Sequence, residues 1–510
     1  MSVRFRSALA LAAAAAVAVL STTSSAVAAP APPTTTTVPA AAAAGWLAQQ
    51  FVGADAKASP SGDHFDFPGG TSYWGGLTAS GVFALAAAKV GGDKIDSVLG
   101  YMKTNVASDA LADFGAGPYD GSVATYALAA IVAGADPSSF GGVNLLQTLK
   151  DDECTAAANS DGSDYSAPLC PAAGAAVNIY SSVSESLAIL AEARAGGVYA
   201  PSAGAVTYFL SLQCPNGGFT GDTNACTNDS SASADETAYA AQALQALGGH
   251  GAELMKATDW LVHNRNADGY WVVQGGPDVD STGLAVAALD GAGIDTSSSR
   301  AWLASEQVTT GPTIGAGASR GALKYQGAFS ASSSVKATAD GLLGLSSGAS
   351  LATLTSAGSA ATAPVLALTA PAPKRASVQA GGKQTVTASG FSAGETVTAV
   401  LHSTPITLGT SKASSTGAVA YTFTVPATLA TGSHTVVLTG TISGLSATST
   451  AFTVTAAAPP ATTSTSITAA VAQGENCSQQ ALACTGRDGV QTCAEVEFGV
   501  ALLGVGLLAL

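Results

Sequence analysis

The chain has 510 residues, enough for two or three domains with hydrophobic cores, and 47% of its residues are hydrophobic. Its formal net charge of −15 argues against nucleic acid and anionic lipid as partners. The acidity is uneven, because residues 29–350 contain 29 Asp and Glu against 12 Lys and Arg. This imbalance supports a division of the chain into separate domains.

Residues 1–28 have the pattern of a secretory signal peptide. Two arginines, Arg4 and Arg6, precede an apolar run over residues 8–20, and a small-residue cleavage site (AVA) follows the run. The run is short for a helix that spans a bilayer. We therefore expect an exported protein whose mature chain begins with a Pro/Thr linker over residues 29–39, a composition that builds no core.

Residues 40–350 contain a repeated pair of helices. Six segments have Ser, Thr or Asp near their start, continue with small apolar residues and end in glycine, as expected of capped helices packed on both sides. They are residues 78–92, 122–135, 184–197, 235–249, 279–293 and 335–349. Each follows a segment anchored by an aromatic residue or leucine, at residues 45–51, 98–104, 144–150, 206–213, 258–264 and 300–307. The uneven interval of roughly 40–60 residues fits helix pairs with loops of variable length.

The turns inside these repeats resemble the prenyltransferase and squalene oxidase repeat, with a motif similar to Q-x-x-x-G-G-F/W. The best matches are LQCPNGGF (212–219) with ADETAYAAQAL (234–244), and NADGYW (266–271) with PDVDSTGLAVAAL (277–289). The resemblance implies a terpenoid cyclase-like α/α-toroid of about six helix pairs. In such repeats the motif is structural, since glycine relieves the turn while the amide and aromatic groups join neighbouring helices.

Asp278 and Asp280 lie in the stretch GPDVDST (276–282), which resembles the DxDD motif of class II terpenoid cyclases. In those enzymes the middle acid, here Asp280, protonates an alkene inside a cavity lined by aromatic rings. Here Ser281 replaces the last acid, and aromatic residues make up only 6% of the chain. A parallel stretch, SADET (233–237), also places an acid before Thr, which favours capping of a helix start over catalysis.

Seven cysteines fit an exported, disulfide-permissive protein. Cys154 and Cys170 flank one polar loop, and Cys214 and Cys226 flank another, so each pair is expected to close its own loop. The pairing of Cys477, Cys484 and Cys493 is left open. Residues 222–229 offer oxygens to calcium but lack the glycine and terminal Glu of an EF-hand. No spacing typical of a metal site or a cofactor motif stands out, so neither is expected.

After an uncharged linker over residues 351–370, the hydrophobic pattern changes to a period of two. Strands are predicted at residues 384–389, 395–403, 418–425, 433–440 and 450–455. This spacing fits an all-β sandwich over residues 371–456. The stretch ASGFSAGETVTAVLHS (388–403) resembles the Ig-like modules of actinobacterial surface proteins.

The chain ends with a Pro/Thr/Ser stalk over residues 457–481 and an apolar tail over residues 482–510. The tail opens with LACTG, similar to the LAxTG signal that class E sortases read, formed by Leu482, Ala483, Cys484, Thr485 and Gly486. The resemblance implies transient contact with a sortase, cleavage after Thr485 and attachment to peptidoglycan. The tail is short and no basic residue follows it, which departs from the pattern, and simple secretion is the alternative.

These features predict a multidomain protein, a toroid of helix pairs followed by an Ig-like sandwich, secreted and displayed at the cell wall. We expect the toroid to bind a small apolar ligand or a surface glycan without catalysis, in the concave mouth of the ring. One alternative is a divergent terpenoid cyclase-like enzyme that uses Asp278 and Asp280. The other is a structural or adhesive surface protein.

Overall fold

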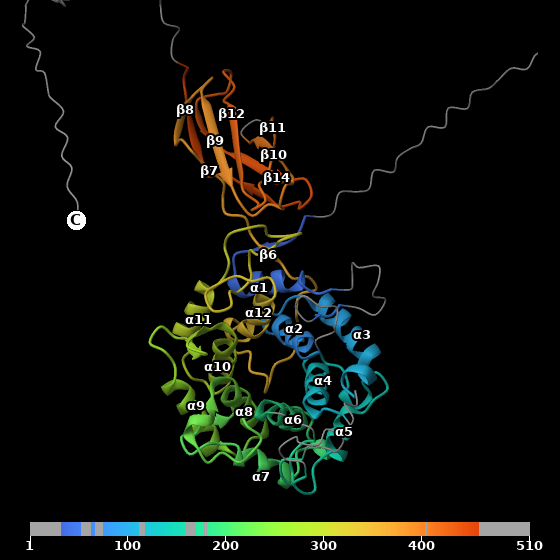
Figure 1. Cartoon of the computed structure of the whole chain (residues 1–510). Helices are drawn as coiled ribbons and strands as arrows, with labels where there is room; N and C mark the ends of the chain where they lie inside the picture. Colours follow the sequence, from blue (N-terminus) through green and yellow to red (C-terminus); the bar gives the residue numbers. More distant parts are fainter. Residues whose placement is uncertain are drawn as a thin grey trace, which may run out of the picture. The chain divides into compact units, whose positions relative to one another are not determined.

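The computed structural model describes residues 32–52, 63–66, 75–111, 118–158, 170–177, 179, 181–402 and 405–457. A helical region precedes a region of strands along the chain (Figure 1). The predicted signal peptide, the stalk and the LACTG segment lie outside the described residues. Within the described ranges, no helix is both long and apolar enough to cross a membrane.

The helical region has twelve α-helices among the described residues, one at each predicted position. Six of them correspond to the Ala-rich segments: α2 (Gly75–Ala88), α4 (Asp120–Val132), α6 (Ser182–Ala195), α8 (Ala234–Leu247), α10 (Val279–Gly291) and α12 (Ser333–Leu345). The six partner helices are α1 (Pro39–Ala48), α3 (Gly92–Asp109), α5 (Leu145–Asp151), α7 (Ala203–Ser211), α9 (Gly251–His263) and α11 (Ser297–Ser305).

The six Ala-rich helices form a closed ring of contacts, and we call them the inner helices. Each packs on the next, from α2 through α4, α6, α8 and α10 to α12, and α12 packs on α2 again. The other six helices pack outside this ring against inner helices (Figure 1). The inner helices can approach closely because their residues are small. A Cβ on Gly283 of α10, for example, would lie 2.3 Å from the carbonyl oxygen of Asp340 on α12.

A threonine in the first turn of an inner helix binds the backbone of the turn that leads into it. The hydroxyl oxygens of Thr78, Thr237, Thr282 and Thr338 accept hydrogen bonds from the amides of Phe65, Phe219, Trp271 and Leu323, at 2.9–3.1 Å. In the first repeat this residue is Thr78. The buried residue of each turn is thereby fixed against its own inner helix.

Glycines of the turns join each repeat to the next one. Gly174, Gly217, Gly269 and Gly321 have positive φ, and a Cβ on any of them would lie 2.3–2.9 Å from the backbone of the following outer helix. For Gly321, in the last repeat, that helix is α1. Gln307 makes the same connection, since its Nε2 donates to the carbonyl oxygens of Gly321 (3.0 Å) and Pro39 (2.9 Å). The first and last repeats are therefore joined like any other neighbouring pair.

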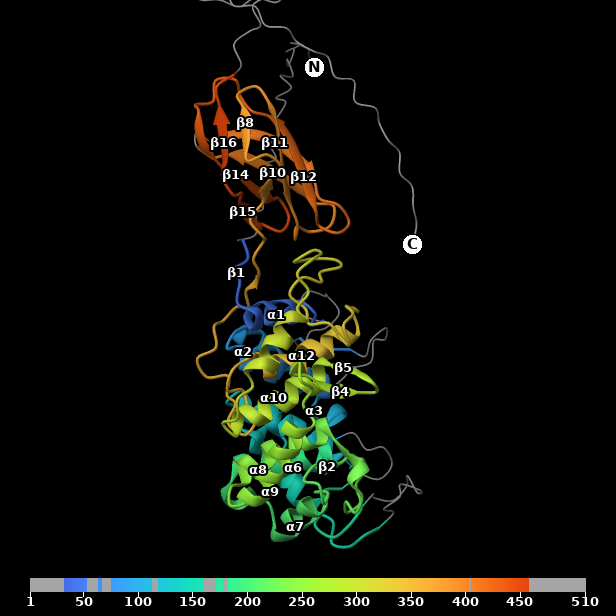
Figure 2. The same ribbon diagram turned by 90° about the vertical axis from the view of Figure 1, so that its left-hand side faces the viewer.

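Four short strands place the turns at the start of two inner helices. Strands β2 (Phe219–Thr220) and β3 (Ala232–Ser233) pair before α8, and β4 (Trp271–Val273) and β5 (Gly276–Asp278) pair before α10. Figure 2 shows β2, β4 and β5 on one side of the helical region. Helices α8 and α10 begin directly after these strands, and their first turns carry the stretches SADET and DVDST.

The segment predicted as a linker, residues 351–370, packs on the helical region over part of its length. The guanidinium of Arg194 on α6 donates to the carbonyl oxygens of Leu351 (2.8 Å) and Leu354 (2.7 Å). Further on, β6 (Val365–Leu366) pairs in parallel with β1 (Thr35–Thr36), which lies in the predicted Pro/Thr linker. Both segments therefore contribute ordered structure, which their low-complexity composition did not indicate.

The strand region is built from three small sheets with the alternating burial that the sequence predicted. Their orders are β11 (Ile406–Lys412), β10 (Thr396–Leu401), β14 (Val436–Gly440) and β15 (Ser446–Thr448); β12 (Val419–Thr424), β9 (Lys383–Ala388) and β7 (Ala372–Pro373); and β13 (Gly432–His434), β16 (Phe452–Thr455) and β8 (Ser377–Gln379). In β10, Val397, Ala399 and Leu401 are buried in a separate hydrophobic core. All five predicted strand segments contain strands, whereas β7, β8, β11 and β15 were not predicted.

Candidate ligand-binding cavity

A cavity of about 190 Å³ lies among the inner helices. Its lining comes from α2, α4, α6, α8 and α12, mostly from their first two turns. The apolar part is formed by Leu77, Phe83 and Leu187, and the polar part by Ser80, Thr125, Tyr239, Lys336 and Asp340. Because helices from five of the six repeats contribute, the cavity is a product of ring closure.

A cluster of charged residues borders this cavity, and we call it the Lys336 cluster. It contains Lys336, its ion-pair partners Asp340 and Asp280, and Asp235, which interacts with Lys336 electrostatically without a direct ion pair. Lys336 Nζ on α12 lies 2.5 Å from Asp340 Oδ2 and 3.2 Å from Asp280 Oδ2 on α10. The Asp280 and Asp340 side chains are only 10% and 4% exposed, whereas the Lys336 side chain is 41% exposed. Lys336 retains this accessible surface because it faces the cavity. Its side chain can therefore contact a molecule inside the ring.

The acids of the cluster have more hydrogen-bonding capacity than the structure uses. Among the described residues, the buried Oδ1 atoms of Asp235, Asp280 and Asp340 have no hydrogen-bond partner. A buried carboxylate oxygen without a donor is costly, so such atoms call for a proton, a water or a ligand. One lysine serves three carboxyl groups, and the cluster is anionic at ordinary protonation.

Burial and charge shift the protonation of the cluster. Burial raises the pKa of Asp280; Lys336 opposes this shift, and Asp340 and Asp278 add to it. Burial by itself would lower the pKa of Lys336, but the carboxylates of Asp340 and Asp280 outweigh it and raise that pKa. Burial, followed by Asp340, also raises the pKa of Tyr239. Lys336 therefore remains a hydrogen-bond donor, while Asp280 retains its proton more readily than an exposed aspartate.

The two acids of DVDST have different roles. Asp278 is the N-cap of α10, and its Oδ1 accepts from the amide of Ser281 at 3.1 Å. Its Oδ2 accepts from Nε2 of Gln326 at 3.4 Å. Asp280 instead pairs with Lys336. The capping interpretation is thus right for Asp278 and wrong for Asp280, because the second residue of the helix points towards α12 and not back to the free amides.

The register of the repeats explains how the cluster forms. Asp235 in SADET, Asp280 in DVDST and Lys336 in SVKAT each precede the anchoring threonine by two residues. They occupy the same position on α8, α10 and α12, which are consecutive in the ring. Our reading of the sequence overlooked Lys336, Asp340 and Tyr239. An alignment of the three stretches would have placed Lys336 beside the two acids.

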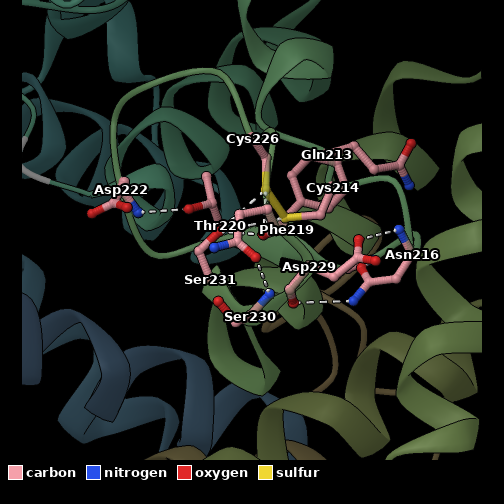
Figure 3. Close-up of a disulfide and its surroundings, with 12 residues drawn as sticks. Gln213, Cys214, Asn216, Phe219, Thr220, Asp222, Cys226, Asp229, Ser230 and Ser231 are labelled. Atoms are coloured by element: carbon pink, nitrogen blue, oxygen red, sulfur yellow. Dashed lines mark hydrogen bonds between the residues drawn. A yellow bond between two sulfur atoms is a disulfide. The ribbon is translucent and has the colours of Figure 1, made fainter.

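Both predicted disulfides are present, Cys154–Cys170 and Cys214–Cys226. Figure 3 shows the second one, and the loop beside it is held by its own polar groups. Asn216 N donates to Asp229 Oδ1 at 2.8 Å, and Asn216 Nδ2 donates to the Asp229 carbonyl oxygen at 3.1 Å. Over the described part of the chain, no cluster of His, Cys, Asp or Glu could hold a metal ion.

The first disulfide loop is attached to buried acids of the inner helices. After Cys170, the amide of Ala176 donates to Glu185 Oε2 (3.0 Å) and the amide of Val177 donates to Asp120 Oδ2 (2.6 Å). Burial raises the pKa of Glu185 to about 8, although the Ala176 hydrogen bond opposes the shift. These acids serve as anchors for the loop. Cys477, Cys484 and Cys493 lie outside the described residues.

Comparisons with known proteins identify no family. No protein-family model and no curated protein sequence matches the chain. Among solved structures, a polysaccharide lyase has a TM-score of 0.36 and 11% identity, over 54% of this chain and 90% of the other. A fragment of alpha-2-macroglobulin from Escherichia coli has a TM-score of 0.29 and 13% identity, over 74% of this chain and 72% of the other. TM-scores this low inform neither the fold class nor the function.

Proposed function

We propose that this chain is an exported binding protein whose helical region is an α/α-toroid of the prenyltransferase and squalene oxidase type. In this proposal the toroid binds one sugar unit of a surface glycan in the central cavity and does not turn it over. The observation that carries the proposal is the lining of the cavity, which combines aromatic and aliphatic groups with a lysine, a carboxylate and hydroxyl groups.

The lining favours a sugar over the purely apolar ligand that the sequence also allowed. An apolar molecule in the cavity would remove Lys336 and Asp340 from water without replacing their hydrogen bonds, which is costly. A sugar offers hydroxyl groups to both residues and an apolar ring face to Phe83. A volume of about 190 Å³ is small for a ligand pocket and suits one small ring.

Catalysis by Asp280 is the second candidate, favoured by the position of this acid beside the cavity. A terpenoid cyclase-like reaction needs an acid strong enough to protonate an alkene. The shift at Asp280 is in the opposite direction, because a raised pKa makes the carboxyl group a weaker acid. The ammonium of Lys336 at 3.2 Å opposes this shift by stabilising the carboxylate, which is the form that has no proton to donate. Polyprenoid cyclisation by the wild type, abolished in Asp280→Asn, would establish this alternative.

The remaining parts of the chain suit display of the toroid outside the cell. The two disulfides fit an extracellular protein. In this proposal the strand region is an Ig-like spacer, and a sortase links Thr485 to peptidoglycan. The alternative of a purely structural or adhesive protein requires no ligand in the cavity, so a binding experiment separates the two.

The test is binding of the full secreted chain to an array of bacterial surface glycans. Ser80 lines the cavity, and Ser80→Trp is designed to fill it. Ser108 is exposed on α3, so Ser108→Trp makes the same chemical change away from the cavity. We expect binding by the wild type and Ser108→Trp, and at least tenfold weaker binding by Ser80→Trp. Equal binding by all three would place the ligand elsewhere, and no binding by any would favour a structural role.

A further inference from the structure

We propose that the ligand of the cavity carries a primary ammonium group, so that the bound sugar unit is an amino sugar with a free amine. This inference rests on the proposed function and specifies its ligand. It comes from three features of the cavity: the excess of carboxyl groups, their unused oxygen atoms and the aromatic rings beside them.

The charges around the cavity are unbalanced. Asp235 on α8, Asp278 and Asp280 on α10, and Asp340 on α12 oppose one lysine, Lys336. Like charges that are buried at short range repel one another, which is unfavourable. A ligand cation would remove part of this repulsion, whereas a neutral ligand would not. An acidic sugar would add to it.

The unused hydrogen-bonding capacity indicates a donor. Asp280 and Asp340 are both buried, and the Oδ1 atom of each has no partner in the described structure. The Lys336 ammonium occupies the Oδ2 atoms of both residues. A second ammonium that enters from the cavity next to Asp340 would find acceptors after a small rotation of the carboxyl groups. Its three N–H donors suit such a set of oxygens.

The aromatic side chains complete a site for a cation. Phe83 on α2 and Tyr239 on α8 both line the cavity, together with Asp340. The face of an aromatic ring attracts an ammonium group, most strongly where water is excluded. The carboxylate of Asp340, combined with aromatic rings in one small cavity, therefore selects an amine over a hydroxyl group in the same position.

The experiment is calorimetric titration of the full chain with three probes that differ at one substituent: methyl glucosaminide, methyl glucoside and methyl N-acetylglucosaminide. One favourable charge interaction corresponds to about a tenfold change in Kd. We expect the glucosaminide to bind at least tenfold more tightly than either neutral sugar. Asp340→Asn should reduce this preference, while Asp259→Asn, an exposed change on α9, should leave it unchanged.

Lys336→Met gives the sharper result because the two ligand classes should respond in opposite directions. Removal of the lysine leaves the acids without their cation, so the glucosaminide should bind more tightly and the glucoside more weakly. Equal affinity for amine and neutral sugars, or weaker glucosaminide binding by Lys336→Met, would overturn the inference and leave the sugar proposal in place. No binding of any probe would overturn both.

Discussion

The ammonium of Lys336 on α12 lies 3.2 Å from the carboxylate of Asp280 on α10, the residue that corresponds to the catalytic acid of the DxDD motif. The contact joins equivalent positions of two neighbouring repeats. This contact changes the interpretation of DVDST as a helix cap, because Asp278 caps α10 and Asp280 does not. The motif thus contributes one capping acid and one acid of the Lys336 cluster.

Asp280→Asn should change how stability depends on pH. The folded state holds a proton on Asp280 at pH values where the unfolded chain has lost it, because burial raises the pKa. Stability from this group is therefore present at low pH and is lost as pH rises towards the pKa of the folded state. The stability of Asp280→Asn minus that of the wild type, measured by thermal melting, should therefore be larger at pH 8 than at pH 4.5. Identical pH profiles for the two proteins would contradict the shift, and Asp259→Asn is the control.

Gly321→Ala should destabilise the closed ring strongly. Its φ is +104°, and a Cβ would lie 2.9 Å from the carbonyl oxygen of Ala42 on α1. Gly327 also has a positive φ (+79°), but no atom lies within 4 Å of its Cβ position. We expect about 1 kcal/mol of destabilisation for Gly327→Ala from backbone strain and about 3 kcal/mol for Gly321→Ala. If denaturant titrations gave the same loss of unfolding free energy for both variants, the contact of Gly321 with α1 would not be what closes the ring.

Thr282→Val should show what the repeated threonine contributes. Thr282 is fully buried; its hydroxyl accepts from Trp271 N at 3.1 Å and donates to the carbonyl oxygen of Asp278 at 2.5 Å. Valine has the same shape but leaves both groups unpaired, at a cost of about 1–3 kcal/mol. The exposed Thr207→Val on α7 should cost much less. Comparable losses for the two variants in chemical denaturation would argue against the anchoring role.

The Cys214–Cys226 disulfide should stabilise the fourth repeat. It closes a loop with a sequence separation of 12, and by loop entropy its removal should cost about 2–3 kcal/mol. The double variant Cys214→Ala/Cys226→Ala avoids a free thiol and should lower the melting temperature. A melting temperature equal to that of the wild type would mean that the hydrogen bonds of Asn216 and Asp229 suffice to hold the loop.

Local patterns predicted the helices and six of the ten strands of the strand region, but not the contacts between distant positions. The Ala-rich segments with terminal glycines predicted every inner helix. The capping residues and the small residues that permit close packing both lie within one segment, so a local pattern reveals them. The Lys336 cluster joins residues up to about 100 positions apart, which no local pattern reveals. Strand β11 escaped prediction because its burial does not alternate regularly and Gly409 interrupts it. Residues 351–354 are held by Arg194, a partner far away in the sequence.

The most direct measurement for the central claim is native mass spectrometry of the full secreted chain, purified without detergent. We predict an additional mass of one small ligand on the wild type and on Ser108→Trp, lost on denaturation and absent from Ser80→Trp. That result would place a ligand in the cavity between the inner helices. An adduct that persists in Ser80→Trp, or no adduct on any of the three proteins after incubation with the glycans of the array, would contradict the account.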